Sequence, residues 1–232
     1  MKHLFPALLI LALGLAAPLK AQDNPVVVEL YTSQGCSSCP AADAIMHELA
    51  AREDVIALAL HVDYWDYIGW KDPFGNPAHA KRQRAYATAG HRRTIYTPEM
   101  VVAGVTDIVG AKPMELSKAI AEHARQPVLV SLNIARDGDV IHVQAPEMRS
   151  GNAPMTIHML RYTPLRTTEI KRGENRGRTL DYANVVEDWT VLGHWDGRTP
   201  LTMNAPVKGD KPVVVIVQQR NAGPILAAAR LR

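Results

Sequence analysis

The feature that most constrains the fold is the stretch of residues 26–42, where an apolar, β-branched run leads directly into a Cys-Ser-Ser-Cys-Pro motif at residues 36–40. The run Val26–Tyr31 predicts a buried strand, and the alanine-rich segment Ala41–Ala51 predicts a helix. Pro40 suits the first helical turn, because the N–H that proline lacks has no partner there. The chain is therefore expected to carry two thiols from a strand to a helix N-terminus.

Cys36 and Cys39 are the only cysteines of the chain. A disulfide between them closes so small a loop that it removes little entropy from the unfolded chain, and stability is a poor reason for the pair. Redox chemistry or the binding of a soft metal ion explains it better. The helix dipole stabilises a thiolate at this position. We expect Cys36 to be the exposed, reactive sulfur and Cys39 its resolving partner.

The first 21 residues predict a secretory signal that is removed from the mature protein. Lys2 precedes an apolar core over residues 8–17, which is too short to span a bilayer, and Ala21 ends a plausible cleavage site. A retained amphipathic anchor is the alternative. Loss of Lys2 and Lys20 lowers the formal charge from +3 to +1, which gives no support to nucleic-acid binding. The expected location is periplasmic or secreted, without a stable membrane anchor.

A second buried strand is predicted at Val55–His61, so that strand, helix and strand form a βαβ unit. The segment that follows, residues 61–74, leaves the carboxyl end of this strand, where ligand groups gather in open α/β sheets. Asp63, Tyr64 and Trp65 are therefore expected to form a substrate-binding wall beside the thiols. The alternative is that the aromatic side chains close a hydrophobic core beneath a long loop.

Further along, the sequence predicts a helix over residues 77–89, with Asn76 as its N-cap and Gly90 at its end. Thr97 and Pro98 precede a short apolar strand, which suggests a cis peptide bond, since proline does not sit inside a central strand. A third helix is predicted at Met114–Ala124.

From Pro127 onward the pattern changes to short strands with frequent turns, which favours an antiparallel, sandwich-like arrangement. We therefore expect an α/β unit at residues 22–126 and a β-rich unit at residues 127–232. The predicted strands are Val128–Ala135, Val140–Gln144, Met155–Tyr162, Leu165–Lys171, Val185–His194, Leu201–Ala205, Pro212–Gln219 and Ile225–Leu231. Between two of them, residues 171–178 predict a solvated loop, or a loop that holds an anionic group through Arg176 and Arg178.

Together these features resemble the thioredoxin superfamily over residues 25–126. The runs at residues 29–40, 61–74 and 96–104 are also similar to a bacterial family of exported, thioredoxin-like proteins of unknown function. The resemblance implies a thioredoxin-like N-terminal domain. It carries little information about activity, because that family has no assigned function.

The resemblance also implies roles for particular residues. Pro98 matches the cis-proline that faces the dithiol in thioredoxins, and Thr97 precedes it as part of the partner-binding backbone. Glu29 is the candidate for the buried carboxylate that exchanges a proton with the dithiol, provided that one residue is inserted between strand and cysteine. Gly35 stands where thioredoxins carry a tryptophan, and the Ser-Ser dipeptide matches no familiar redox class.

The function that these observations favour is thiol–disulfide exchange with protein or small-molecule thiols or disulfides of the cell envelope, without a cofactor. The direction of electron flow stays open. Two alternatives remain. One is a Cu(I) metallochaperone that uses both cysteines with a histidine such as His61, His79 or His91. The other is a partner-binding module whose dithiol is not catalytic. The cysteine and histidine spacing does not favour zinc.

Overall fold

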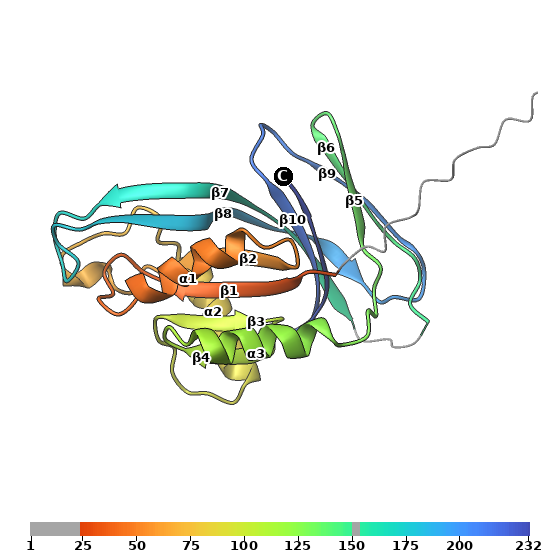
Figure 1. Ribbon diagram of the computed structural model, residues 1–232. Coiled ribbons are helices and arrows are strands. Elements are labelled where there is room, and N and C mark those ends of the chain that lie inside the picture. Colours follow the sequence, from red (N-terminus) through yellow and green to blue (C-terminus); the bar gives the residue numbers. More distant parts are fainter. Residues whose placement is uncertain (1–23, 150–153) are drawn as a thin grey trace, which may run out of the picture.

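The computed structural model describes residues 24–149 and 154–232, and the predicted signal at residues 1–21 lies outside them. The chain has a mixed α/β fold with one large, mostly antiparallel sheet (Figure 1). In chain order the elements are β1 (Val26–Thr32), α1 (Pro40–Ala50), β2 (Val55–His61), the 3-10 helix η1 (Asp66–Ile68), α2 (Pro77–Ala89), β3 (Glu99–Val102), β4 (Thr106–Val109), α3 (Pro113–Ala124), β5 (Asn133–Asp137), β6 (Val140–Ala145), β7 (Met155–Glu169), β8 (Thr179–Trp195), β9 (Leu201–Pro206), β10 (Val213–Gln219) and β11 (Ile225–Leu231).

The eight strands of the large sheet follow the order β11-β10-β7-β8-β2-β1-β3-β4. The pairs β1–β2 and β2–β8 are parallel, and the other pairs are antiparallel. The sheet thus contains strands from both sides of residue 126, and the predicted division there into two units stays a prediction. Because β1 and β2 are parallel, their carboxyl ends at Thr32 and His61 lie side by side.

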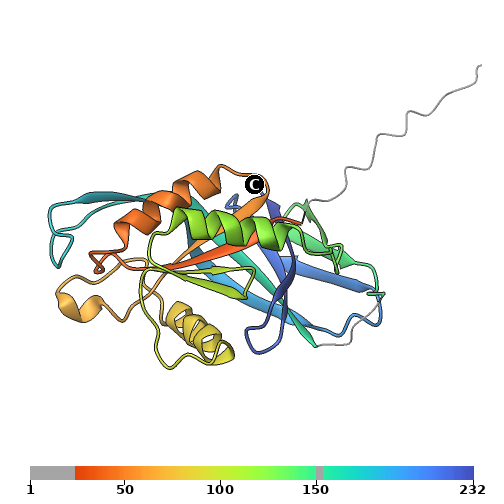
Figure 2. The same cartoon turned by 60° about the horizontal axis from the view of Figure 1, so that its bottom comes forward.

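The helices cover both faces of the β1–β2 region (Figure 2). Val28 and Leu30 of β1 pack in one apolar cluster with residues of α1 and α3. Val27 and Tyr31, one residue out of step, pack on the opposite face with residues of α2. This alternation follows from the pleat of the strand, in which successive side chains point to opposite faces.

The other half of the molecule has a core between two sheets. The three-stranded sheet has the order β5-β6-β9. Its inward side chains, such as Ile141 and Leu201, share an apolar cluster with Ile157 of β7 and Val215 of β10. The predicted strand at Val128–Ala135 begins only at Asn133, although Val130 and Leu132 are buried as its alternation implied.

The strands predicted separately at residues 155–162 and 165–171 are one continuous strand, β7. Pro164 lies within it. Beyond Arg161, which pairs with Val213, β7 no longer has β10 as a neighbour. It is therefore an edge strand at Pro164, where a missing N–H breaks no pairing on that side. The consequence is a long β7–β8 hairpin that reaches past the sheet to the end where α1 begins (Figure 1).

In the part of the chain that the structure describes, none of the helices is both long enough and apolar enough to cross a bilayer.

Candidate functional site

The two cysteines form a disulfide at the first turn of α1, with a Cα–Cα distance of 5.4 Å. Cys39 is the N-cap, and Pro40 opens the helix as predicted. The expectation that Cys36 is exposed is wrong: Cys36 is 1% exposed and Cys39 0%. The exposed residues of the motif are Ser37 and Ser38 instead.

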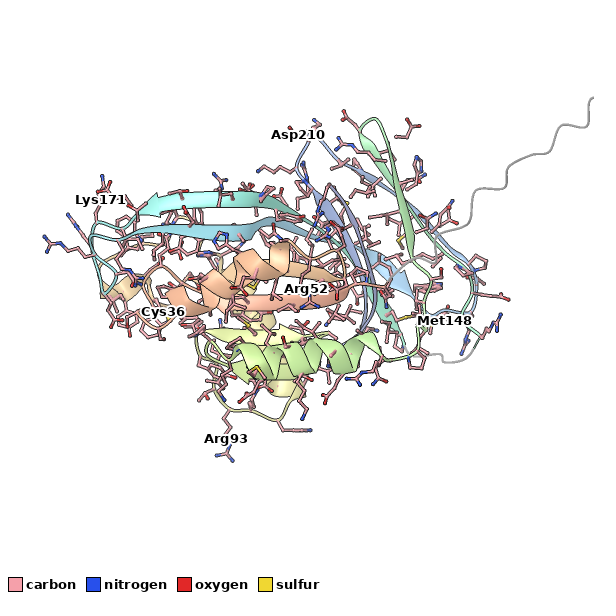
Figure 3. The ribbon with its side chains drawn as sticks, viewed as in Figure 1. Cys36, Arg52, Arg93, Met148, Lys171 and Asp210 are labelled. Atoms are coloured by element: carbon pink, nitrogen blue, oxygen red, sulfur yellow. A yellow bond between two sulfur atoms is a disulfide. The ribbon has the colours of Figure 1, made fainter. Side chains whose placement is uncertain are left out.

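The tip of the β7–β8 hairpin, residues 170–178, contacts the turn that carries the disulfide. The side-chain amide of Asn175 donates to the carbonyl oxygens of Gln34 and Cys36, at 2.9 Å each. Glu174 accepts a hydrogen bond from the Ser37 backbone N–H at 3.2 Å. Figure 3 shows Cys36 and Lys171, a residue of this tip, at the same end of the molecule. The tip is therefore packed against the dithiol turn and is not the freely solvated loop that we expected.

The two arginines of this tip are both exposed, and their expected role in holding an anionic group stays a prediction. Arg178 donates to the side-chain oxygen of Asn175 at 3.0 Å, which fixes the orientation of the Asn175 amide. Arg176 is exposed. The role of Arg178 in the structure is thus to brace the contact with the dithiol turn.

Trp65 connects the dithiol turn to the segment that contains Pro98. A Cβ on Gly35 would lie 3.0 Å from the Cβ of Trp65, closer than side chains pack, so glycine permits this approach. The Trp65 indole N–H donates to Thr97 Oγ1 at 2.7 Å. The peptide bond between Thr97 and Pro98 is cis, as predicted. Three of the predicted site residues therefore lie in one connected group beside the disulfide.

The remaining residues of the predicted wall divide between core and surface. Tyr64 donates to Gln83 at 3.2 Å, and burial raises the pKa of Tyr64 to about 12. Tyr67, which sequence reasoning did not single out, is 80% exposed and stacks on Trp65 at 6.3 Å between ring centroids. Asp63 is half-buried, and its carboxylate has no hydrogen-bond partner among the described residues.

A buried carboxylate lies one helical turn after Cys39. The backbone N–H of Asp43 donates to the carbonyl oxygen of Cys39 at 3.0 Å, so the i and i+4 side chains share one face of α1. Asp43 Oδ1 accepts a hydrogen bond from Thr32 Oγ1 at 2.8 Å. Burial raises the pKa of Asp43 to about 7, against the lowering effects of His61 and Thr32. Asp43 can therefore gain or lose a proton near neutral pH.

A second carboxylate, Asp72, holds the neighbouring histidine. His61 Nδ1 donates to Asp72 Oδ2 at 2.8 Å, and the Gln34 backbone N–H donates to the same oxygen at 2.8 Å. Burial by itself raises the pKa of Asp72, but His61 and the two backbone N–H donors lower it further. Asp72 is thus ionised. The His61 ring also lies edge-on to Tyr182, 4.8 Å between centroids.

Three buried atoms of this cluster lack a hydrogen-bond partner among the described residues: Asp43 Oδ2, His61 Nε2 and the Tyr182 hydroxyl. Unsatisfied polar atoms this deep are unusual in proteins and mark functional positions or bound water. A cavity of about 360 Å³ at the start of α1 is lined by Asp43, His47, Arg178 and Asp181 among others. Asp43 is thus both buried and adjacent to a route to solvent.

Glu29 is not near the disulfide. It points to the α2 face of the sheet, where Arg82 Nε donates to it at 2.7 Å and the Tyr86 hydroxyl at 2.5 Å. The disulfide lies on the α1 face. The reason is the strand alternation: Glu29 is out of step with Thr32, the residue of β1 that faces α1.

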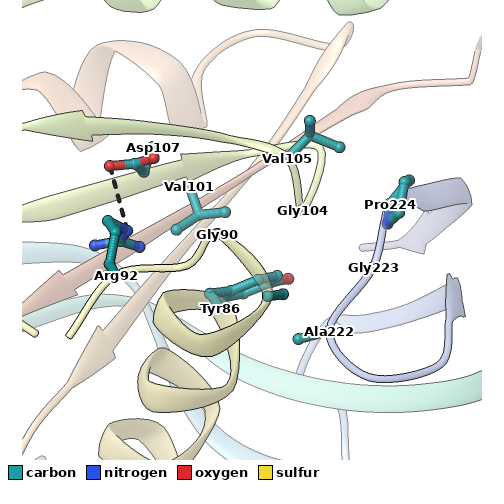
Figure 4. A pocket seen from close by; sticks show the side chains of 11 residues that line it. Tyr86, Gly90, Arg92, Val101, Gly104, Val105, Asp107, Ala222, Gly223 and Pro224 are labelled. Atoms are coloured by element: carbon teal, nitrogen blue, oxygen red, sulfur yellow. Dashed lines mark ion pairs between the residues drawn. The ribbon is translucent and has the colours of Figure 1, made fainter. Parts of the chain in front are cut away.

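A second cavity, of about 200 Å³, lies apart from the dithiol between α2, the β3–β4 turn and the β10–β11 turn. Figure 4 shows Tyr86, Arg92 and Asp107 in its wall, with an ion pair between Arg92 Nε and Asp107 at 3.7 Å. None of its lining residues belongs to the dithiol segment.

The histidines proposed as copper ligands differ in burial. His61 and His79 are buried, and His79 Nδ1 donates to the His61 carbonyl oxygen at 2.8 Å. His91 is exposed at the end of α2. Within residues 24–149 and 154–232, no three histidine, cysteine or acidic side chains are grouped as metal ligands are.

Three residues of the site were not predicted from the sequence: Asp43, Asp72 and Asn175. Asp43 carried a detectable signal, because it is the only acidic residue in the first turn of an alanine-rich helix, four positions after Cys39. Asp72 lies in the segment at residues 61–74, where ligand groups were expected, but no sequence feature distinguished Asp72 from its neighbours. Asn175 is 139 positions from Cys36 in the chain, and no local pattern identifies such a contact.

Comparison with known proteins gives a family and a fold. Residues 27–218 match the family described as "Protein of unknown function (DUF1223)". A protein from Agrobacterium tumefaciens with an X-ray crystal structure is 30% identical in sequence to this chain, with a TM-score of 0.78. The match covers 91% of this chain and 96% of the Agrobacterium chain. HBP35 of Porphyromonas gingivalis is 17% identical, with a TM-score of 0.61 over 90% of this chain and 75% of its own, which shows similarity of fold alone. No curated protein matches the chain.

Proposed function

This chain belongs to the DUF1223 family of proteins of unknown function, and we propose that it is a thiol–disulfide oxidoreductase with Cys36 and Cys39 as its redox pair. One observation carries the proposal: the disulfide occupies the first turn of α1, and the buried acid Asp43 follows one turn later. A helix N-terminus stabilises the thiolate of the reduced state, and a nearby acid with a pKa of about 7 can exchange its proton.

The arrangement around the disulfide supports a thioredoxin-like interpretation of the first half of the chain. The parallel strands β1 and β2 flank α1 in the sequence, and β3 and β4 continue the sheet on the other side of β1. The cis bond before Pro98 stands at the start of β3 and is joined to the dithiol turn through Trp65 and Thr97. These are the positions that the resemblance assigned to a cis-proline loop facing a dithiol.

The reaction starts from the oxidised protein. A partner thiolate attacks Cys36 Sγ, the Cys36–Cys39 bond breaks, and Cys39 leaves as a thiolate that takes a proton. A second partner thiolate then attacks the mixed disulfide and releases Cys36 as a thiolate. The partner dithiol is oxidised by two electrons, and the protein's disulfide is reduced to the Cys39 thiol and the Cys36 thiolate. The reverse sequence reduces a partner disulfide.

Asp43 is the group that we assign to the proton of Cys39, in place of Glu29. Its side chain shares the buried face of α1 with Cys39, and Thr32 holds Oδ1 so that Oδ2 remains available. In its protonated form it donates to the leaving Cys39 thiolate, and in its ionised form it accepts the proton when Cys39 attacks. The cavity lined by Asp43 and His47 links it to solvent.

The partner is expected to be a protein or small-molecule thiol or disulfide in the cell envelope, and the chain to be periplasmic or secreted. Tyr67 provides the exposed contact for such a partner, because it stacks on Trp65 beside the dithiol turn. A carboxy-terminal tag and cell fractionation test the location. The mass of the mature N-terminus tests the predicted cleavage after Ala21.

The test is exchange with a glutathione redox buffer, followed by mass spectrometry after acid quenching. We expect the wild-type disulfide to be reduced and re-formed, Cys39→Ala to accumulate a mixed disulfide on Cys36, and Cys36→Ser to accumulate much less. Asp43→Asn should slow release of Cys39 and remove the pH dependence of that step near pH 7. Glu48→Gln, an exposed acid on the same helix, is the matched control and should behave as wild type.

No exchange by the wild-type protein under native conditions, together with no trapped species in Cys39→Ala, overturns the proposal. A second candidate then gains support. Because both sulfurs are almost fully buried, the chain can instead be a partner-binding module whose disulfide only holds the first turn of α1. That candidate predicts that a variant in which both cysteines are replaced still restores the wild-type phenotype to a deletion strain.

A further inference from the structure

A second site lies on the opposite face of the large sheet from the disulfide. It is a pocket of about 370 Å³ between one side of α2 and the strands β7, β8 and β10, closed at one end by the β10–β11 turn. This volume is within the range of small-molecule sites in proteins. None of its lining residues belongs to the dithiol site.

The body of the pocket is apolar. Ala78 and Ala85 contribute from α2, Trp189 and Val191 from β8, and Ala222 from the turn. Positions 78, 81, 82 and 85 share one side of the helix because of its 3.6-residue period. The pocket therefore offers an aromatic ring and several methyl groups to an apolar ligand surface.

The arginine in the pocket is held in a fixed orientation. Arg82 Nε and Nη2 donate to Glu29 at 2.7 and 3.2 Å, and Nη2 also donates to Tyr86 and Gln218. Its guanidinium lies over the Trp189 ring, 4.1 Å from the centroid. The remaining nitrogen, Nη1, has no hydrogen-bond partner in the described part of the chain, and the side chain is 13% exposed. A donor that has a fixed orientation and no hydrogen-bond partner is preorganised to bind an anion.

A histidine supplies a second directed donor. The Trp189 indole N–H donates to His158 Nδ1 at 3.0 Å, so the proton of the neutral ring is on Nε2. Burial, and next the charge of Arg82, lower the pKa of His158 to about 3, which keeps the ring neutral at pH 7. His158 thus offers a hydrogen bond without adding a charge.

The charge of the lining is positive. Lys81 and Arg220 line the pocket together with Arg82, and no acidic side chain does. The carboxylate of Glu29, which forms an ion pair with Arg82, offsets one of the three positive charges. Lys81 and Arg220 form no ion pair within residues 24–149 and 154–232. The pocket therefore combines apolar walls with cationic and N–H donors, which is complementary to an amphipathic anion.

We propose that this pocket binds a small organic anion, a carboxylate attached to an apolar ring or short chain. The carboxylate lies toward Arg82 Nη1 and His158, and the apolar part lies against Trp189 and Val191. Binding at this site does not depend on the redox state of the cysteines, so this proposal is tested independently of the oxidoreductase proposal.

The experiment is isothermal titration of the full mature chain at pH 7 with 2-naphthoate and, as a neutral isostere, 2-naphthamide. We expect saturable 1:1 binding of 2-naphthoate and at least about tenfold weaker binding of the amide. Val191→Asp places a carboxylate at the pocket and should weaken 2-naphthoate binding at least about tenfold. Val109→Asp is the matched control: Val109 is 54% exposed and Val191 53%, but Val109 lies on the edge strand β4.

Absence of saturable 2-naphthoate binding overturns the proposal, as does equal affinity for the amide, or an equal loss of affinity in Val109→Asp and Val191→Asp. If Val191→Asp does not fold, as judged by circular dichroism, the double variant Lys81→Gln with Arg220→Gln decides: severalfold weaker binding supports the site, and unchanged binding overturns it. The variant with Cys36→Ser and Cys39→Ser should bind 2-naphthoate as tightly as wild type.

Discussion

The side-chain amide of Asn175 donates a hydrogen bond to the carbonyl oxygen of Cys36 at 2.9 Å, across 139 positions of the chain. Through this bond the tip of the β7–β8 hairpin is fastened to the turn that carries the disulfide. A second bond of the same amide, to Gln34, completes the attachment. We therefore expect the hairpin to limit how a partner reaches the buried Cys36 sulfur.

We predict that Asn175→Ala exposes the disulfide. The variant leaves two buried carbonyl oxygens without their donor, which should lower the free energy of unfolding by about 1–3 kcal/mol. The rate of disulfide reduction by glutathione should rise severalfold, because the hairpin tip detaches more often. Stopped-flow reduction and denaturant unfolding measure the two effects. Asn133→Ala, at an exposed position of β5, should change neither, and an unchanged reduction rate in Asn175→Ala would show that the tip does not gate access.

Glu174→Gln should make the disulfide more oxidising. The Glu174 carboxylate accepts from the Ser37 N–H at the start of α1, where its charge opposes a thiolate on Cys36. Removing the charge stabilises the reduced state, so the reduction potential should become less negative by about 10–20 mV. Equilibration with glutathione buffers measures the shift. Glu169→Gln, on the exposed end of the same hairpin, should produce a smaller one; a potential that moves in the negative direction would refute the assignment.

Asp43 should make the folded state less stable as the pH rises. Its pKa is about 7 in the folded protein and 3.8 ordinarily, so between these values the folded state holds a proton that the unfolded state has lost. The free energy of unfolding therefore falls by up to about 4 kcal/mol as the pH rises from 4 to 7.

The isosteric Asp43→Asn variant lacks this titration. Its free energy of unfolding, compared with that of wild type, should be higher at pH 8 by a few kcal/mol and similar at pH 4. Urea unfolding at both pH values provides the measurement. The difference between the two proteins isolates Asp43 from His158 and His79, whose pKa values are lowered by burial and whose effect runs in the opposite direction. A difference that does not change with pH would contradict the prediction.

Glu29→Gln should reduce stability without changing the redox chemistry. The substitution leaves the largely buried guanidinium of Arg82 without its carboxylate, and breaking a buried ion pair from one side costs about 3–5 kcal/mol. The disulfide lies on the other face of the sheet, so its reduction potential should equal that of wild type. Thermal unfolding and glutathione equilibration separate the two effects. A release of Cys39 slowed as much as is expected for Asp43→Asn would restore Glu29 as the proton-exchanging residue.

Nearby residues along the chain are enough to specify the local elements around the dithiol. The β-branched run, the proline after Cys39 and the Asn76 N-cap each act within a few residues, and the predicted β2, α2 and β11 agree with the structure. The same is true of the cis bond before Pro98. Such features depend on backbone geometry and on capping, which nearby residues control.

The surroundings of the dithiol, in contrast, follow from the tertiary fold. The burial of Cys36, the contact with Asn175 and the choice of Asp43 over Glu29 as the neighbouring acid depend on pairings of β8 with β2 and β7 and on which face of β1 meets α1. Hydrogen bonds and desolvation act through space, and the groups that meet at this site are separated by more than a hundred residues. A local pattern predicts that two thiols stand at a helix start, but their exposure and proton exchange are set by what the rest of the chain places against them.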